Sequence, residues 1–281
     1  PTRSRGLGDV YKRQAMSIGK ARRPLLIPAI ITAIALPFLP LVLWSFSERW
    51  FFPDLLPARF GLRAWAYVFG TAGPQIVDAL WQSVCVSGAT TLISVAVGVP
   101  AGRVLGLCDF RGKSLVALLL VLPVIVPSLA VAMGLHLWFL RLGLTETAAG
   151  VVLIHLTFCL PYAVFVMWGV FANYNPDFEA QARSLGATPL QVLWRVMLPF
   201  TVTGVAVAGL FAFLLSWSQY LSTLIIGGGQ ITTLPVLLFA LMGSGDRPVA
   251  AAVSLVFVAP ALGALILTSR SMGRREITGV W

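Results

Sequence analysis

Few side chains of this chain could carry out covalent chemistry, and the sequence does not group them. His136, His155 and Asp78 lie singly in long apolar stretches. An intramembrane enzyme would need a convergent set such as H-E-x-x-H or paired aspartates. The 3 cysteines show no paired spacing, so neither a disulfide framework nor a metal site is expected. The sequence therefore disfavours an enzyme and predicts no catalytic residue, no metal ion and no cofactor.

Nucleotide hydrolysis is not expected of this chain either. The phosphate-binding pattern G-x-x-x-x-G-K-[ST] is absent, and the glycine run 227–229 is not followed by lysine. Any ATP hydrolysis would have to reside on another subunit.

Polar side chains inside the apolar stretches indicate a route for a solute instead, because such residues are costly in lipid and often mark pathways. For Asp78 the alternative is an interfacial charge near the start of its span, and for the cluster 216–220 it is ordinary helix packing. For the histidines, hydrogen bonds between helices are favoured over ligand binding. The pathway candidates are Asp78, Gln82, Ser216, Ser218, Gln219 and Tyr220.

The elements that must position these residues are membrane helices. Of the 281 residues, 58% are hydrophobic and only 11% are charged, against about 25% charged in soluble domains. Charges gather between apolar runs, which favours an all-α polytopic membrane protein over a soluble protein with one very large core. A span needs about 20 apolar residues. The predicted spans are 25–46, 76–107, 115–140, 148–172, 200–226 and 249–268.

The formal net charge of +10 is interpreted as a signal for the orientation of the chain in the membrane. No basic stripe with interleaved aromatic residues is present, so we expect no nucleic-acid partner. Lys and Arg are enriched in cytoplasmic loops. If the N-terminus is placed inside, the inside segments hold more of these basic residues than the outside segments. Both termini are therefore predicted to be cytoplasmic. The inside set is Lys20, Arg22, Arg23, Arg103, Arg111, Lys113, Arg183, Arg195, Arg270, Arg274 and Arg275, and the outside set is Arg49, Arg59, Arg63, Arg141 and Arg247.

The segment 179–199, between the fourth and fifth predicted spans, is unusually polar and structured. Asn175 is a plausible N-cap, with Pro176 at the first helical position. Gly186 is suited to end this helix in the left-handed conformation. Thr188-Pro189 repeats the start signal, which predicts a second short helix to about residue 197.

Both predicted helices of this segment are amphipathic. Phe178, Ala182 and Leu185 share one face of the first, and Leu190, Leu193, Trp194 and Met197 follow helical spacing on the second. Helices lying on the lipid surface would show the same pattern. Because the polar face has few basic residues, insertion into the groove of a partner protein is favoured.

The segment resembles the signature loop of the permease subunits of ABC importers, the binding-protein-dependent inner-membrane components. That loop reads Glu-Ala-Ala, three residues, Gly, nine residues, Ile, one residue, Leu-Pro. Gly186 fits, and the same count leads to Val196 and Pro199. Counting back, Ala180 stands where the family has Glu, and Glu179 lies one residue earlier.

The resemblance extends over most of 64–268 and implies a function. In this family the loop is a coupling helix in a groove of a cytoplasmic ATPase, which drives a permease pair between inward- and outward-facing states. Leu185, Leu190, Leu193 and Trp194 would dock or brace the loop, and Gly186 would permit its bend. The predicted coupling residues are Glu179, Ala182, Arg183, Leu185, Gly186, Leu190, Leu193, Trp194 and Pro199.

The resemblance also implies partners and a location. They are a cytoplasmic ATPase dimer, a second permease subunit that is a copy or a different chain, a periplasmic or lipid-anchored substrate-binding protein, and membrane lipid. The location is the bacterial inner membrane, and the run 227–229 would form an outer loop that touches the binding protein. The substrate would be a small polar solute or ion, such as a polyamine, ferric iron, thiamine or sulfate. An ion-gradient-driven secondary transporter remains the alternative.

The expected organisation has four parts. Residues 16–75 form the first span and a periplasmic loop, 76–270 the importer core, and 271–281 a cytoplasmic tail. Residues 1–15 do not fit the pattern and are interpreted as a leader that is non-native or disordered.

Overall fold

The computed structural model describes residues 28–51 and 53–277, with side chains through residue 270. The predicted leader 1–15, the start of the first span and the basic residues 20–23 lie outside the described residues, as does the end of the tail.

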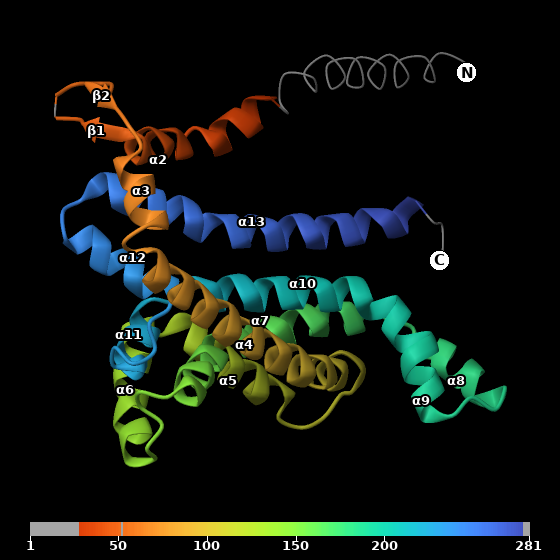
Figure 1. Ribbon diagram of the computed structural model, residues 1–281. Helices are drawn as coiled ribbons and strands as arrows, with labels where there is room; N and C mark the ends of the chain where they lie inside the picture. The colour runs from red at the N-terminus through yellow and green to blue at the C-terminus, as the bar shows by residue number, and fades with distance from the viewer. Residues whose placement is uncertain (1–27, 52, 278–281) are drawn as a thin grey trace, which may run out of the picture.

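The described chain is almost wholly helical, which confirms the all-α expectation (Figure 1). A helical segment, Pro28–Ala35, precedes the labelled elements. These are α2 (Phe38–Ser45), β1 (Ser47–Arg49), β2 (Arg59–Phe60), α3 (Arg63–Phe69), α4 (Gly73–Leu107), α5 (Lys113–Ile125), α6 (Ser128–Arg141), α7 (Ala148–Ala172), α8 (Asp177–Ser184), α9 (Pro189–Val192), a π-helical turn (Leu193–Met197), α10 (Leu198–Trp217), α11 (Leu221–Gly227), α12 (Leu234–Gly243) and α13 (Arg247–Ile277).

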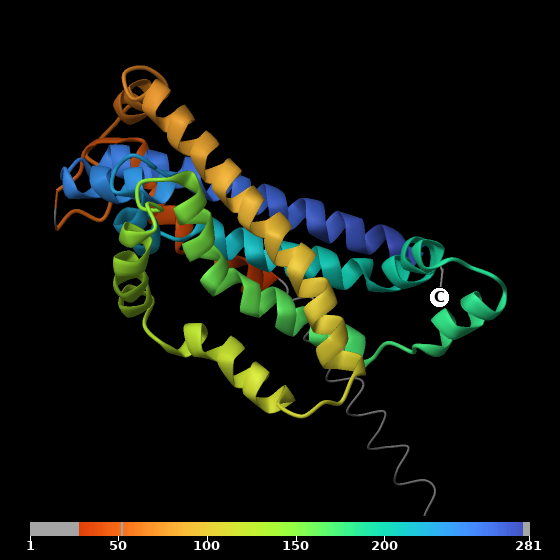
Figure 2. The ribbon, with the colours of Figure 1, turned by 90° about the horizontal axis from the view of Figure 1, so that it is seen from below.

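The long helices run between two ends of the bundle (Figures 1 and 2). One end, here called the loop end, carries α8, α9 and the connection from α4 to α5. The other, the hairpin end, carries the antiparallel pair β1–β2, α3 and the turn from α12 to α13. The two ends place the segments predicted to be inside and outside on opposite sides of the bundle.

Four helices among the described residues are long and apolar enough to cross a membrane, or up to six if each of two bent pairs counts as one span. The four are Gly73–Leu107, Ala148–Ala172, Pro189–Trp217 and Arg247–Arg270. The six-span prediction therefore fits only if both bent pairs span. The first pair, Pro28–Ala35 and Phe38–Ser45, bends by 47°.

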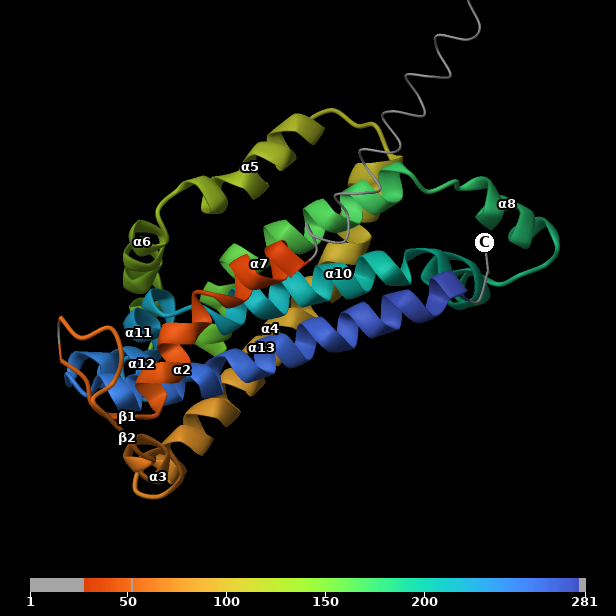
Figure 3. The ribbon, with the colours of Figure 1, turned by 90° about the horizontal axis from the view of Figure 1, so that it is seen from above.

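The predicted third span 115–140 is not one straight helix. Its two halves, α5 and α6, meet at 104°. Val126 between them is extended, with ψ 135°, because a residue before proline is disfavoured in the helical conformation. Pro127 thus makes the break, and α5 lies out from the main bundle beside α7 (Figure 3).

The boundaries of the predicted fifth span 200–226 need correction at both ends. The helix begins earlier, since α9, the π-helical turn and α10 join into one helical run Pro189–Trp217. It also ends earlier, because the chain turns at 218–220 before the separate α11. The polar residues at this turn interrupt the apolar pattern.

The core is built from α4 and α7 in close contact, with α10 packed on both. Small residues of α4 allow the approach: a Cβ at position 98 would lie 3.0 Å from the Cβ of Ala163, and one at Gly102 would lie 2.5 Å from the Cβ of Met167. Close packing of this kind drives helix association in lipid. The helix α4 continues through Pro100 without a break.

Candidate functional site

The loop 173–199, here called the coupling loop, starts with a turn at Asn175 that leads into a short helix. The Asp177 amide donates a hydrogen bond to the Asn175 side-chain oxygen at 2.9 Å. The helix α8 begins at Asp177, so its N-cap residue is Pro176 and not the predicted Asn175, and Pro176 precedes the first helical residue. Acidic residues 177 and 179 in the first turn favour the positive end of the helix dipole.

The predicted bend at Gly186 is confirmed. Gly186 has φ +84°. Its amide bonds the Arg183 carbonyl at 3.0 Å, and the Ala187 amide bonds the Ala182 carbonyl at 3.0 Å. This pair of hydrogen bonds is the Schellman motif, which ends a helix at a residue with positive φ.

The second helix of the loop starts with a complete capping box. The Gln191 amide donates to Thr188 Oγ1 at 3.4 Å, and the Thr188 amide donates to Gln191 Oε1 at 2.8 Å. The spacing Thr-x-x-Gln was available in the sequence as a signal for this pair. A π-helical turn follows just before Pro199, which has no amide to donate to the preceding turn. Because the helix then continues into α10, α9 is joined directly to a candidate span.

Four apolar side chains of the coupling loop lie on its surface and are here called the docking face. Leu185 is 88% exposed, Leu190 64%, Trp194 62% and Leu193 39%. By contrast, Phe178 stacks on Phe200 with a centroid distance of 5.1 Å. The loop thus keeps some apolar residues for its own packing and leaves the docking face uncovered in this chain.

The acid at the start of the coupling loop points into the protein. Glu179 is 4% exposed. Arg103 of α4 binds both of its carboxylate oxygens, with Nη1–Oε1 at 2.5 Å and Nη2–Oε2 at 2.9 Å. Arg183 adds a contact from Nη2 to Oε2 at 3.3 Å. Sequence reasoning included Glu179 and Arg183 but treated Arg103 only as an orientation charge.

Hydrogen bonding by Arg103 lowers the pKa of the Glu179 carboxyl below its usual value. Because the pKa is lower in the folded state, the ion pair stabilises the fold at pH values above the usual pKa of Glu. This stabilisation is lost as the pH falls through the lowered pKa. The ion pair is therefore fully formed at neutral pH.

Two hollows flank the coupling loop. One of about 370 Å³ lies between α4 and the loop, with Arg103, Glu179 and Leu193 among its lining residues. Another of about 450 Å³ lies between the two loop helices, beside Leu185 and Gly186. The loop therefore has an uneven surface with apolar side chains at its edges.

The pathway candidates on α4 do not share one environment. Asp78 is exposed near the start of the helix. Gln82 Oε1 accepts a hydrogen bond from the Thr232 amide at 2.8 Å, and the neighbouring Ser83 accepts one from the Leu234 amide at 2.7 Å. Gln82 thus helps to fix the segment that follows α11.

The cluster 216–220 lies at the turn from α10 to α11, where each candidate has its own environment. Ser218 is exposed and bonds the Leu215 carbonyl. Gln219 Oε1 accepts from Ser222 Oγ at 2.8 Å. The ring of Tyr220 stacks on Phe239 at 4.0 Å.

Ser216, the remaining candidate, is 3% exposed and faces a histidine. Its Oγ lies 2.8 Å from His155 Nδ1, while His155 Nε2 lies 2.9 Å from Thr223 Oγ1. His155 therefore bridges α7, α10 and α11, as its interpretation as a helix-bridging residue predicted. His136 has no such bridge in the described part of the chain, since its Nδ1 is buried without a partner.

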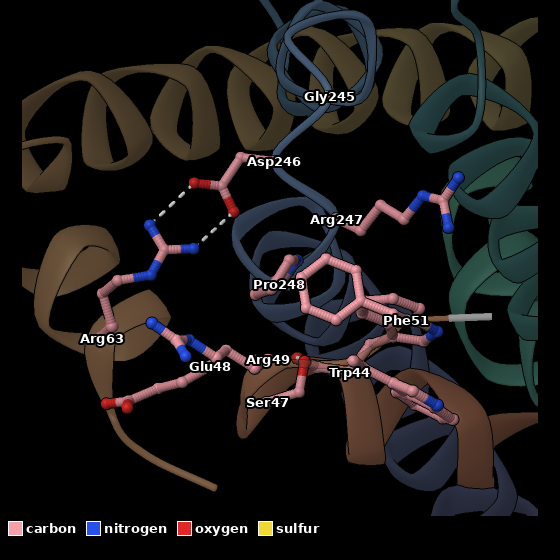
Figure 4. A pocket seen from close by; sticks show the side chains of 11 residues that line it. Trp44, Ser47, Glu48, Arg49, Phe51, Arg63, Gly245, Asp246, Arg247 and Pro248 are labelled. Carbon is pink, nitrogen blue, oxygen red and sulfur yellow. Dashed lines mark hydrogen bonds and ion pairs between the residues drawn. The ribbon is translucent and has the colours of Figure 1, made fainter. Parts of the chain in front are cut away.

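A separate hollow of about 570 Å³ opens at the hairpin end (Figure 4). The Arg63 guanidinium and the Asp246 carboxylate are among its lining groups and bind each other directly, with Nη1–Oδ2 at 2.9 Å and Nη2–Oδ1 at 2.8 Å. Arg247 lies over the Trp44 ring at 5.6 Å. The Arg63–Asp246 ion pair joins α3 to the α12–α13 turn. None of the residues predicted to be functional lines this hollow.

We expect Arg63→Gln to remove a pH-dependent stabilisation of the hairpin end. The Arg63 hydrogen bonds lower the pKa of Asp246, so the contribution exists above the usual Asp range and disappears as the pH falls through the lowered pKa. Both side chains are partly exposed, at 52% and 34%, which limits the effect to about 1 kcal/mol or less. Thermal unfolding of the detergent-purified chain should show a lower Tm for the variant at neutral pH.

The two unfolding temperatures should converge in acid, where Asp246 is protonated in both proteins. Arg59→Gln is the matched control, because Arg59 is 72% exposed and makes a single contact with Glu48 at 3.3 Å. A Tm difference for Arg63→Gln that is equal at both pH values would contradict the role of this ion pair.

Comparisons with known proteins identify the family of this chain. Residues 94–273 match the family model described as binding-protein-dependent transport system inner membrane component. The molybdenum transport system permease protein ModB of Mycobacterium tuberculosis is 33% identical over 213 residues, covering 70% of this chain and 78% of ModB. The spermidine/putrescine transport system permease protein PotC of Escherichia coli K12 is 22% identical over 268 residues, covering 93% and 97%.

A solved bacterial ABC transporter involved in the import of alginate has the same fold, with a TM-score of 0.68 at 17% identity over 91% of this chain and 97% of the solved chain. The relatives are transport permease proteins, and this chain is a transport subunit rather than an enzyme. It is thus a multi-pass inner-membrane protein that belongs to the binding-protein-dependent transport system inner membrane component family, the permease subunits of ABC importers.

Proposed function

We propose that this permease forms part of a translocation pathway and transmits the movement of a cytoplasmic ATPase to that pathway through the coupling loop. The observation that carries the proposal is the exposed docking face on a helix pair whose second helix is capped at Thr188 and continues into a candidate span. An amphipathic helix with uncovered apolar anchors is suited to the groove of a partner protein.

The proposed orientation is supported by the position of the basic segments. The coupling loop lies at one end of the bundle with the basic connection 108–113 and the end of α13, so this end is proposed to face the cytoplasm. The hairpin end then faces the periplasm and would meet a substrate-binding protein there. The solved structure of the alginate transporter was determined in complex with such a periplasmic protein, which supports this arrangement.

An ATPase dimer needs two coupling loops, and this chain supplies one. A second permease subunit, identical or different, is therefore part of the proposal. The exposed apolar surface of α4, α5 and α6 is available both for lipid and for that subunit.

The proposed substrate is a small polar solute or ion. The relatives are named for molybdenum, molybdate or tungstate, trehalose, and spermidine or putrescine, so their chemistry spans anions, sugars and cations. Gln219, Ser216, Ser218 and Tyr220 are neutral polar groups, which gives no reason to favour a cation.

Transport by proteoliposomes tests this function. The permease is reconstituted with an ATPase, a partner permease and a binding protein of the same organism, and uptake of labelled molybdate, spermidine and trehalose is measured. We expect uptake of one class of solute that requires both ATP and the binding protein. Uptake that follows a proton gradient without ATP would instead establish a secondary transporter and overturn the proposal.

A further inference from the structure

The placement of Glu179 is the starting point, because it differs from what the motif count gives. The count puts the acid at position 180, where this chain has alanine, and Ala180 is exposed. A shift of one residue rotates a side chain by about 100° around a helix axis. Glu179 accordingly faces α4 and is 4% exposed, so it is not available to a partner protein that docks on the outside of the loop.

The partner of Glu179, Arg103, lies where several elements meet. Its guanidinium binds the Glu179 carboxylate in a bidentate manner, lies 3.1 Å from Met197 Sδ of the π-helical turn, and lies 5.8 Å from the centre of the Phe171 ring of α7. A planar guanidinium suits such simultaneous contacts, whereas a lysine ammonium does not.

The two helices of the coupling loop are attached to the bundle in different ways. α9 continues through the π-helical turn into α10, so it moves with that helix. α8 has no such continuity: non-helical residues 173–176 precede it and the turn at Gly186 follows it. The Arg103–Glu179 ion pair joins α8 to α4, which itself forms the core with α7.

We propose that Arg103 is a positioning residue for transport: by holding Glu179, it makes α8 move together with α4, so that movement of the coupling loop reaches the core of the bundle. This inference rests on the proposed function. Glu179, the acid nearest to the motif position, then links α8 to α4 inside this chain. The docking face, and not Glu179, makes the contact with the ATPase.

The main test moves the acid by one residue. The double variant Glu179→Ala/Ala180→Glu keeps the net charge and the composition unchanged, but it turns the carboxylate towards the exposed side of α8. We expect it to behave like Glu179→Gln. If it restores wild-type transport, the acid acts on an external partner and the inference is overturned.

The second test asks whether the two residues act as a unit. Arg103→Gln and Glu179→Gln should each lower the amount of solute transported per ATP hydrolysed by about tenfold, and the double variant should be no worse than either, because both remove the same interaction. Arg103→Lys, which keeps the charge, should recover part of the loss. If the loss of transport in the double variant equals the product of the two single losses, the two residues act independently, which would contradict a shared role.

A measurement that needs no transported solute separates this inference from the proposed function. Trypsin cleavage after Arg183, which is 60% exposed, should become about tenfold faster in Arg103→Gln than in the wild-type complex if α8 is released. The control is Lys113→Gln, which breaks an ion pair with Asp109 near the same end of the bundle and should change neither cleavage nor transport. Unchanged cleavage in Arg103→Gln would overturn the inference even if the wild-type complex imports a solute in an ATP-dependent manner.

Discussion

Replacement of Trp194 by alanine is expected to release the ATPase from the permease while the permease remains folded and inserted. Trp194 is 62% exposed in this chain, so its removal leaves no internal cavity. In a complex, a buried aromatic anchor of this kind is worth about 2 kcal/mol or more, which corresponds to at least about a thirtyfold loss of affinity. The measurement is the amount of ATPase subunit that co-purifies with the tagged permease, together with uptake by proteoliposomes.

Trp138→Ala is the matched control for this experiment. Trp138 has a similar exposure of 61% but lies on α6, away from the coupling loop. It should leave the amount of bound ATPase unchanged. If the Trp194→Ala permease still binds as much ATPase as the wild type, the docking face is assigned wrongly. The alternative, in which the loop helices lie on the lipid surface, is then favoured.

The second large effect is expected at Gly186, where the backbone rather than a side chain is decisive. No heavy atom lies within 4 Å of a Cβ built at this position, so a new side chain meets no steric obstacle in the chain. The obstacle is φ +84°, which costs most residues about 1–2 kcal/mol and is especially unfavourable for β-branched ones. Gly186→Val should therefore open the turn and shift α8, with Leu185, relative to α9 and Trp194.

The expected result is a roughly tenfold loss of ATP-dependent uptake for Gly186→Val, with normal membrane insertion. Gly186→Asn provides the control, because asparagine is tolerated in the left-handed conformation at helix ends. It should retain most of the activity. Equal activities for the valine and asparagine variants would show that coupling does not depend on this backbone conformation.

The coupling loop was predictable in detail because its structure is set by neighbours in the chain. A left-handed glycine at Gly186 and a helix start at Thr188 each depend on residues within a few positions, whereas the predicted N-cap Asn175 lies one residue before the observed N-cap, Pro176. Helical periodicity placed Leu190, Leu193 and Trp194 on one face, and the structure leaves these side chains exposed.

The ends and bends of the spans were less predictable, since hydropathy reports only an average over a window. The run 115–140 contains no charged residue, but Pro127 breaks it into two helices at 104°. The run 200–226 contains the turn at 218–220, where Gln219 and Ser222 bond each other. Apolar character alone does not distinguish one straight helix from two that meet at an angle.

Composition, charge placement and local motifs in the sequence were sufficient to predict a helical membrane protein with a structured loop. Burial in lipid and helix capping depend on residue type and short spacing, which the sequence shows directly. Only the tertiary structure decided which way Glu179 faces and what it binds. Its partner Arg103 lies 76 residues away, and no short spacing encodes a contact that depends on how α4 and the coupling loop pack. The same holds for His155, which meets Ser216 and Thr223 from 61 and 68 residues away. Polar groups buried between helices take their partners from packing, and packing is a property of the whole bundle.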